Sequence, residues 1–212
     1  MEANEKQFIK NLSQSLKPMR TFNPFHRTIF WLLLFIPSTV LFMLYLQAYR
    51  PTFLDHLIHY PRFSLEIVSG CLLGSLFVFS FFGSIIPGYR FSKKIIMSGF
   101  VFLALLLISL FLSFIDPSPP ESHLGARPYC AEEAFAYEIL GVLSLIVFLR
   151  NIDWRISFTY CLFAGIGVGL FPALLMEMAC MYTPMHALFF HFGPSVFVGI
   201  FAAYILSIKI TR

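Results

Sequence analysis

The sequence predicts an all-α membrane protein, a bundle of six transmembrane helices joined by short loops. Of the 212 residues, 58% are hydrophobic and only 12% are charged, and the apolar residues gather in long runs. A soluble domain carries about 25% charged residues, whereas about 20 consecutive apolar residues are enough to cross a bilayer. The predicted spans are about 28–49, 64–86, 95–115, 134–149, 157–179 and 185–208. The fourth run is the shortest and relies on its flanks to reach a spanning length.

The first run follows a basic tail and is not followed by a small-residue cleavage site, so we interpret it as a retained helix. The chain then divides into a cytoplasmic tail over residues 1–27, a membrane domain over 28–208 and a short C-terminus over 209–212. Only one predicted loop is long, the proline-containing stretch 116–133.

Basic residues predict the orientation, because cytoplasmic loops are enriched in Lys and Arg. With six spans, the side that holds both termini carries all but Arg50, Arg62 and Arg127 of the 15 basic residues. Both termini are therefore predicted to be cytoplasmic. The net charge of +4 is explained by contact with the anionic inner leaflet of the lipid bilayer, so we expect no direct contact with nucleic acid.

Small residues and prolines predict how the helices pack. Gly165 and Gly169 in the fifth span, and Gly70 and Gly74 in the second, have the small-xxx-small spacing that lets helices approach closely. Three prolines lie inside spans and are expected to kink them: Pro37, Pro172 and Pro194.

Ionisable residues inside spans are costly and are functional candidates by default. Here they are predicted to lie only in the outer half of the membrane, at Glu66, Glu138, Glu177, His186 and His191. We interpret them as one supporting polar layer.

Two cysteines belong to the same outer layer. Cys130 precedes the fourth span and Cys180 ends the fifth, on the side exposed to oxidants. A structural disulfide and a redox- or metal-responsive thiol pair are both consistent with this position, and so are two unrelated free thiols. Cys71 and Cys161 lie within spans and are interpreted as packing residues.

Cys130, Cys180 and His186 are also a candidate metal-binding set, since thiolate and imidazole ligands select zinc, cadmium or copper(I). His123, His191 and Glu177 are further candidate ligands. No local metal-binding spacing supports the set, and His186 and His191 are five residues apart, which does not place them on one helix face. We therefore assign no metal and expect no cofactor.

The tail contains one candidate amphipathic helix. Its apolar stripe consists of Phe8, Leu12, Leu16 and Met19. Two interpretations stay open: a helix lying on the inner membrane surface, and a helix that docks in a groove of a soluble protein.

Several short stretches resemble the NrsF family of bacterial inner-membrane proteins. They are LKPMR at 16–20, FNPFHR at 22–27, Arg50 with Pro51, PRFSLE at 61–66, Pro87 with Gly88, and the late series Cys180, Pro184 and His191. Two positions depart from the family pattern: Phe190 stands where Trp is common before the His, and Met181 where Pro often follows the Cys.

The resemblance implies a negative regulator (anti-sigma factor) of an extracytoplasmic-function sigma factor, embedded in the bacterial inner membrane. It implies that Cys130 and Cys180 respond to heavy-metal or oxidative stress. It also implies that the tail holds the sigma factor, through a surface that we predict to comprise Phe8, Leu12, Leu16, Met19 and Arg20.

Competing classes of function predict other patterns. A small proton- or metal-coupled transporter would need polar groups through the full depth of the membrane, and we keep it as the alternative. A membrane thiol oxidoreductase is expected to carry a C-x-x-C pair, which is not present. No catalytic constellation stands out, so we expect no enzymatic activity, and the oligomeric state is left open.

Overall fold

The computed structural model describes residues 23–46, 50–86, 88–123, 125–149 and 156–210. The all-α prediction is confirmed, because these residues form helices and contain no strand. The helices are α2 (Pro24–Tyr45), α3 (Phe53–His59), α4 (Pro61–Ser84), α5 (Lys93–Ile115), α6 (Cys130–Phe148), α7 (Phe158–Ala179), α8 (Pro184–His186), η1 (Ala187–Phe192) and α9 (Gly193–Ile210).

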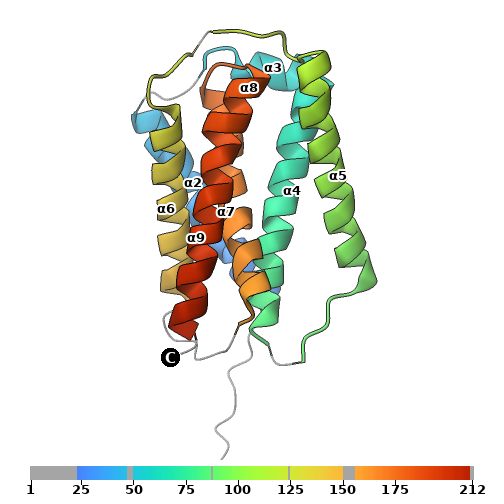
Figure 1. Cartoon of the computed structure of the whole chain (residues 1–212), viewed down its shortest axis with the longest axis vertical. Coiled ribbons are helices and arrows are strands. Elements are labelled where there is room, and N and C mark those ends of the chain that lie inside the picture. Colours follow the sequence, from blue (N-terminus) through green and yellow to red (C-terminus); the bar gives the residue numbers. More distant parts are fainter. Residues whose placement is uncertain (1–22, 47–49, 87, 124, 150–155, 211–212) are drawn as a thin grey trace, which may run out of the picture.

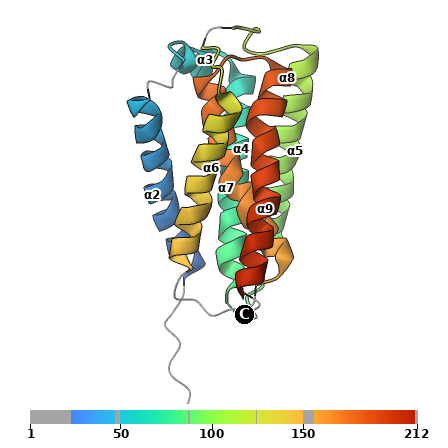
Figure 2. The same cartoon turned by 60° about the vertical axis from the view of Figure 1, so that its left-hand side comes forward.

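The long helices run side by side along one axis (Figure 1). Helix α7 is the central element and contacts α2, α4, α6 and α9, whereas α5 packs mainly on α4 at one edge. The short helices α3 and α8 both lie at one end, which we call the outer end. The start of α2 and the end of α9 lie at the opposite, inner end (Figures 1 and 2).

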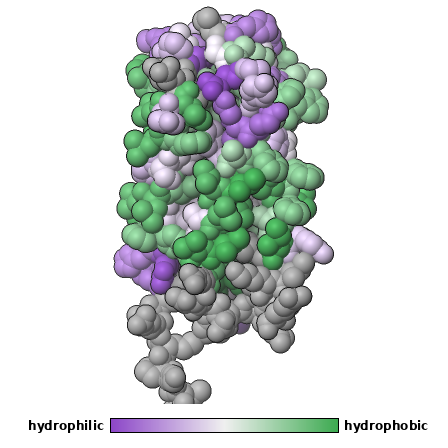
Figure 3. Space-filling view, turned by 90° about the vertical axis from the view of Figure 1, so that its left-hand side faces the viewer, coloured by the Kyte–Doolittle hydropathy of each residue, from purple (hydrophilic) through white to green (hydrophobic). Residues whose placement is uncertain are grey.

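Five of the described helices are long and apolar enough to cross a membrane: α2, α4, α5, α7, and the continuous helix formed by α8, η1 and α9. The predicted count of six is not confirmed, because α6 carries Glu132, Glu133 and Glu138 within 19 residues. Large apolar side chains such as Phe100 and Phe111 face outward, at 64% and 66% exposure. Hydrophobic residues cover the middle of the face in Figure 3, and hydrophilic residues gather at the outer end, as expected for a multi-pass membrane protein.

Glycines set the distance of α7 from its neighbours, as the small-residue spacing predicts. A Cβ at Gly165 would collide with the backbone of Gly199 on α9. A Cβ at Gly74 of α4 would lie 3.0 Å from the carbonyl oxygen of Gly167. These close backbone approaches confirm the packing role predicted for the glycines.

Two helices begin four residues earlier than predicted. Helix α2 begins at Pro24 rather than near residue 28, because the Asn23 side chain accepts hydrogen bonds from the backbone N–H groups of Phe25 and His26, at 3.0 and 3.3 Å. Helix α6 begins at Cys130 rather than near residue 134.

The sequence did not predict α3, a seven-residue helix in the first outer loop. The amphipathic stripe and Arg20 lie outside the described residues.

Candidate functional site

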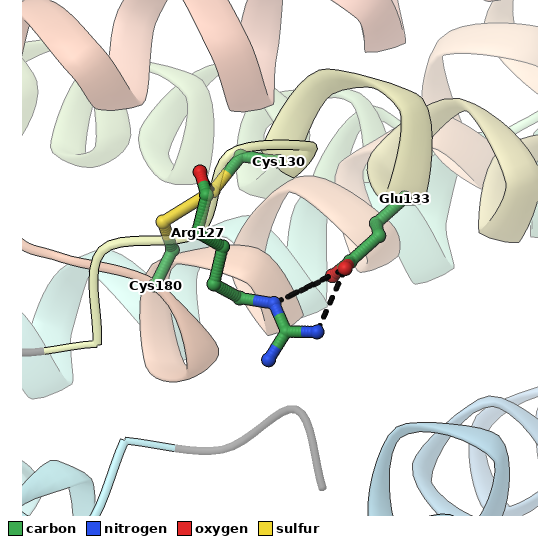
Figure 4. Close-up of polar contacts among 4 residues, drawn as sticks. All are labelled: Arg127, Cys130, Glu133 and Cys180. Carbon is green, nitrogen blue, oxygen red and sulfur yellow. Dashed lines mark hydrogen bonds and ion pairs between the residues drawn. A yellow bond between two sulfur atoms is a disulfide. The ribbon is translucent and has the colours of Figure 1, made fainter. Parts of the chain in front are cut away.

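A disulfide joins Cys130 to Cys180 at the outer end of the bundle (Figure 4). Cys130 is the first residue of α6 and Cys180 is the C-cap of α7, so the bond ties together two helix ends that are 50 residues apart in sequence. Both residues are buried, at 2% and 0% exposure, which shields the bond from bulky reductants.

The loop before α6 is fixed over the disulfide. Ser122 and Tyr182 form an isolated antiparallel bridge, with reciprocal backbone hydrogen bonds of 3.1 and 3.2 Å. Gly125 has a φ of 83°, and a Cβ there would lie 3.2 Å from the carbonyl oxygen of Ala179. Only a glycine easily adopts this conformation, so the loop can lie directly on the end of α7.

Arg127 and Glu133 form an ion pair beside the disulfide (Figure 4). The Arg127 guanidinium donates three hydrogen bonds to the Glu133 carboxylate, at 2.7 to 3.1 Å. Because both side chains are partly buried and the geometry is bidentate, the pair should hold the loop against the first turn of α6.

Arg50 anchors the chain around Cys180. Its side chain is fully buried, Nη1 donates a 3.2 Å hydrogen bond to the carbonyl oxygen of Cys180, and the guanidinium lies 5.9 Å from the Phe63 ring centroid. Burial lowers the pKa of Arg50, and Glu177 opposes part of the shift. An arginine nevertheless stays protonated in proteins, so a positive charge lies next to the disulfide.

Two carboxyl groups lie inward of Arg50. Ser109 on α5 donates a 3.0 Å hydrogen bond to Oε2 of Glu66 on α4. Glu177 is fully buried beside Glu66 and Arg50, and neither of its carboxylate oxygens meets hydrogen-bond geometry with a partner. Tyr182 lies beside this group, and its hydroxyl forms a 3.1 Å hydrogen bond with Ser113. Because burial raises the pKa of Tyr182, this hydroxyl stays neutral.

A third carboxyl group, Glu138, lies between α6, α7 and α9. It is fully buried without a hydrogen-bond partner, and a Cβ at Gly169 would collide with its Oε1. Ser195 on α9 donates hydrogen bonds of 2.9 Å to the carbonyl of Gly169 and 3.0 Å to that of His191. Glycine at 169 therefore leaves the space that the Glu138 carboxyl occupies.

Two histidines complete the site. Nε2 of His186 lies 3.3 Å from the sulfur of Cys180, and the His186 ring is 5.1 Å from the ring of His191, centroid to centroid. A disulfide sulfur has no proton to give, so the tautomer protonated at Nε2 donates to it. His191 is fully buried, and neither ring nitrogen has a hydrogen-bond partner.

The outer end therefore brings together the predicted sensing pair, Cys130 and Cys180, and places His186 and His191 beside it. The predicted supporting residues lie deeper in two places: Glu66 and Glu177 lie together beside Arg50, and Glu138 lies apart from them beside Gly169. Cys71 and Cys161 are free, partly or fully buried, and pack in the interior clusters. His123 is exposed and is not part of the cysteine and histidine cluster.

Sequence reasoning missed the structural role of Arg50, which it treated as one of three outward basic residues and as part of the family resemblance. The available signal was its position immediately before Pro51 in a chain with few charges. The reasoning also missed that His186 and His191 approach each other. A proline at 194, within the turn that follows His191, was the relevant signal.

No protein-family model matches the chain, and no curated protein or solved structure matches it either. The fold and the site define its class as a multi-pass, all-helical membrane protein with a buried disulfide and histidine cluster at one end.

Proposed function

We propose that this protein is a membrane-embedded anti-sigma factor. It holds an extracytoplasmic-function sigma factor through its cytoplasmic tail and releases it when oxidative or heavy-metal stress changes the state of Cys130 and Cys180. The resemblance to the NrsF family supports the assignment of the partner. The bacterial inner membrane, cytoplasmic termini and a sixth crossing by α6 belong to the same proposal.

The observation that carries the proposal is the disulfide between the outer ends of α6 and α7. Opening or closing this bond changes whether α6 is held at the outer end of α7. A signal must favour one of two packings by several kcal/mol to switch a population almost completely, about 5.5 kcal/mol for a change from 1:99 to 99:1. Closing a loop across a 50-residue separation contributes up to about 4 kcal/mol, which supplies most of that difference.

Helix α6 connects this bond with the start of α2, where the tail begins. Near the inner end, Trp31 of α2 donates a 2.9 Å hydrogen bond from Nε1 to Oγ of Ser144 on α6. Nearer the outer end, the rings of Phe42 and Tyr137 meet edge to face at 5.7 Å. A shift of α6 would therefore displace α2, and with α2 the segment that precedes Pro24.

The distribution of buried charge favours sensing over transport. Among the described residues, the buried side chains of the Asp, Glu, His, Lys and Arg types are Arg50, Glu66, Glu138, Glu177 and His191. At about 1.5 Å per helical residue, each helical one lies within about 12 Å of the outer end of its helix. A proton or metal path would need partners in the inner half, so we expect no uptake by proteoliposomes.

Affinity capture tests the proposal. The full chain, tagged at its C-terminus, is purified from membranes under reducing conditions, and bound protein is identified by mass spectrometry. We expect a sigma factor to co-purify and to leave when a thiol oxidant is added. The Cys130→Ser, Cys180→Ser double variant should retain its partner after oxidation, whereas the Cys71→Ser, Cys161→Ser control should release it. Release from the first variant would disprove the role of these cysteines.

A further inference from the structure

Four side chains from three elements converge at the disulfide. They are Cys130 at the start of α6, Cys180 at the end of α7, and two residues of the continuous last helix: His186, which ends α8, and His191, which lies within η1. One potential ligand atom from each residue lies within 4.8 Å of those of the other three. A disulfide needs no imidazole, so the two histidines call for a separate explanation.

A π-helical segment brings the histidines together. Residues five apart in an α-helix differ by about 140° around the axis, because each residue turns the helix by about 100°. In η1 the backbone N–H of Gly193 instead bonds to the carbonyl oxygen of Leu188, five residues earlier. The wider turn rotates His191 toward His186, and such segments occur often at functional sites.

His191 provides a second, independent observation. It is fully buried, and both of its ring nitrogens lack a hydrogen-bond partner. Buried polar groups are almost always paired, so an unpaired imidazole directed at two sulfurs indicates that a further group binds there. Imidazole nitrogen and thiolate sulfur are the ligands of tetrahedral zinc and cadmium sites.

We propose that the reduced protein binds one soft divalent cation, of the zinc and cadmium class, through Cys130, Cys180, His186 and His191. In a tetrahedral site with bonds of about 2.0–2.3 Å, ligand atoms lie about 3.3–3.8 Å apart. The four atoms need to move by only about 1 Å to reach that arrangement. Two thiolates neutralise the cation, which suits a buried site, and Arg50 beside Cys180 favours the thiolate form.

The disulfide and the metal complex exclude each other. Two molecules of a thiol reductant give two electrons and two protons to the disulfide, which yields two cysteine thiols and a disulfide of the reductant. The cation then displaces the two thiol protons and accepts sulfur and nitrogen lone pairs. The inference deepens the proposed sensing function and rests on it for its biological meaning, although binding itself can be measured separately.

Cadmium titration tests the inference. The full chain in detergent micelles is reduced with a water-soluble phosphine and titrated with Cd²⁺ alone, while the ultraviolet thiolate-to-cadmium charge-transfer band is recorded. We expect one Cd²⁺ per chain and no band from the oxidised protein. His191→Ala and His186→Ala should each weaken binding by at least about 10–100-fold, the loss typical of removing even an outer partner of a ligand. His123→Ala, at an exposed position, should bind as the wild type does.

Cadmium-113 NMR of the reduced wild-type protein provides a readout that does not depend on the folding of any variant. Two sulfur and two nitrogen ligands should give a chemical shift distinct from that of a two-sulfur, two-oxygen site. An absence of binding, a shift of the oxygen type, or unchanged affinity in both histidine variants would overturn the inference.

The two proposals fail separately. If a sigma factor is captured and is released by oxidation while Cd²⁺ does not bind, only the metal site is wrong. If Cd²⁺ binds with the expected ligands and no sigma factor is captured, only the anti-sigma function is wrong.

Discussion

Replacing Arg50 with methionine should destabilise the outer end of the bundle. The substitution removes the hydrogen bond to the Cys180 carbonyl and the contact with the Phe63 ring. A hydrogen bond from a charged donor contributes about 1.5–3 kcal/mol, and a cation–π contact about 0.5–1 kcal/mol. Since methionine keeps much of the packing volume, we expect the free energy of unfolding to fall by about 2–4 kcal/mol.

Glu177 is fully buried near Arg50 without a hydrogen-bond partner. Residues that lie close together in one polar group are expected to couple. The double substitution Arg50→Met, Glu177→Gln should therefore not equal the sum of the single substitutions. Arg50→Lys should fall between wild type and Arg50→Met, because lysine keeps the charge and loses the planar donor geometry.

Thermal unfolding of the detergent-purified protein measures the effect. In a protein of this size 1 kcal/mol corresponds to about 2–4 °C, so Arg50→Met should lower the Tm by about 4–16 °C. Arg62→Met is the matched control. It removes a long ion pair of 3.7 Å to Asp116, whose side chain is 85% exposed, and such pairs contribute about 0–1 kcal/mol. A Tm for Arg50→Met within the range of this control would refute the anchoring role of Arg50.

Three further predictions concern the disulfide and the helix contacts. Reduction should lower the Tm of the wild-type protein, by up to the equivalent of about 4 kcal/mol of loop closure, and should leave the Tm of the Cys130→Ser, Cys180→Ser variant unchanged. Gly165→Leu should sharply reduce the yield of folded protein, because its side chain would enter the backbone of α9, whereas Gly99→Leu, with open space at its Cβ, should fold normally. Trp31→Phe should cost about 1 kcal/mol by removing the hydrogen bond to Ser144, and it should weaken oxidant-induced release of the captured sigma factor without changing the disulfide on a non-reducing gel.

Much of the fold could be predicted because a bilayer imposes length and polarity on each helix. Five predicted apolar runs correspond to helices of spanning length, and the glycine pairs predicted close packing that the backbone contacts confirm. Helix α6 was harder to assign, since it combines Glu132, Glu133 and Glu138 with an otherwise apolar sequence. The surroundings of its acidic side chains could not be predicted from the sequence, because burial of Glu138 depends on the space that Gly169 of α7 leaves beside it.

The site was predicted at the level of residues but not of contacts. Topology predicted that Cys130 and Cys180 lie in one outer layer. Whether they bond depends on how far the outer ends of α6 and α7 are offset along the bundle axis, which the sequence does not give. The approach of His191 to His186 depends on the type of helical turn between them. Pro194 has no N–H and its ring would clash with the carbonyl of residue 190 in an α-helix, and a π turn directly before it relieves that clash. A proline that would merely kink a span in the sequence interpretation thus turns a histidine toward the sulfurs.

Pro194→Ala should restore α-helical register and rotate His191 away from His186, and it should therefore weaken Cd²⁺ binding by the reduced protein. Pro37→Ala, in a helix that contributes no ligand, should leave that binding unchanged.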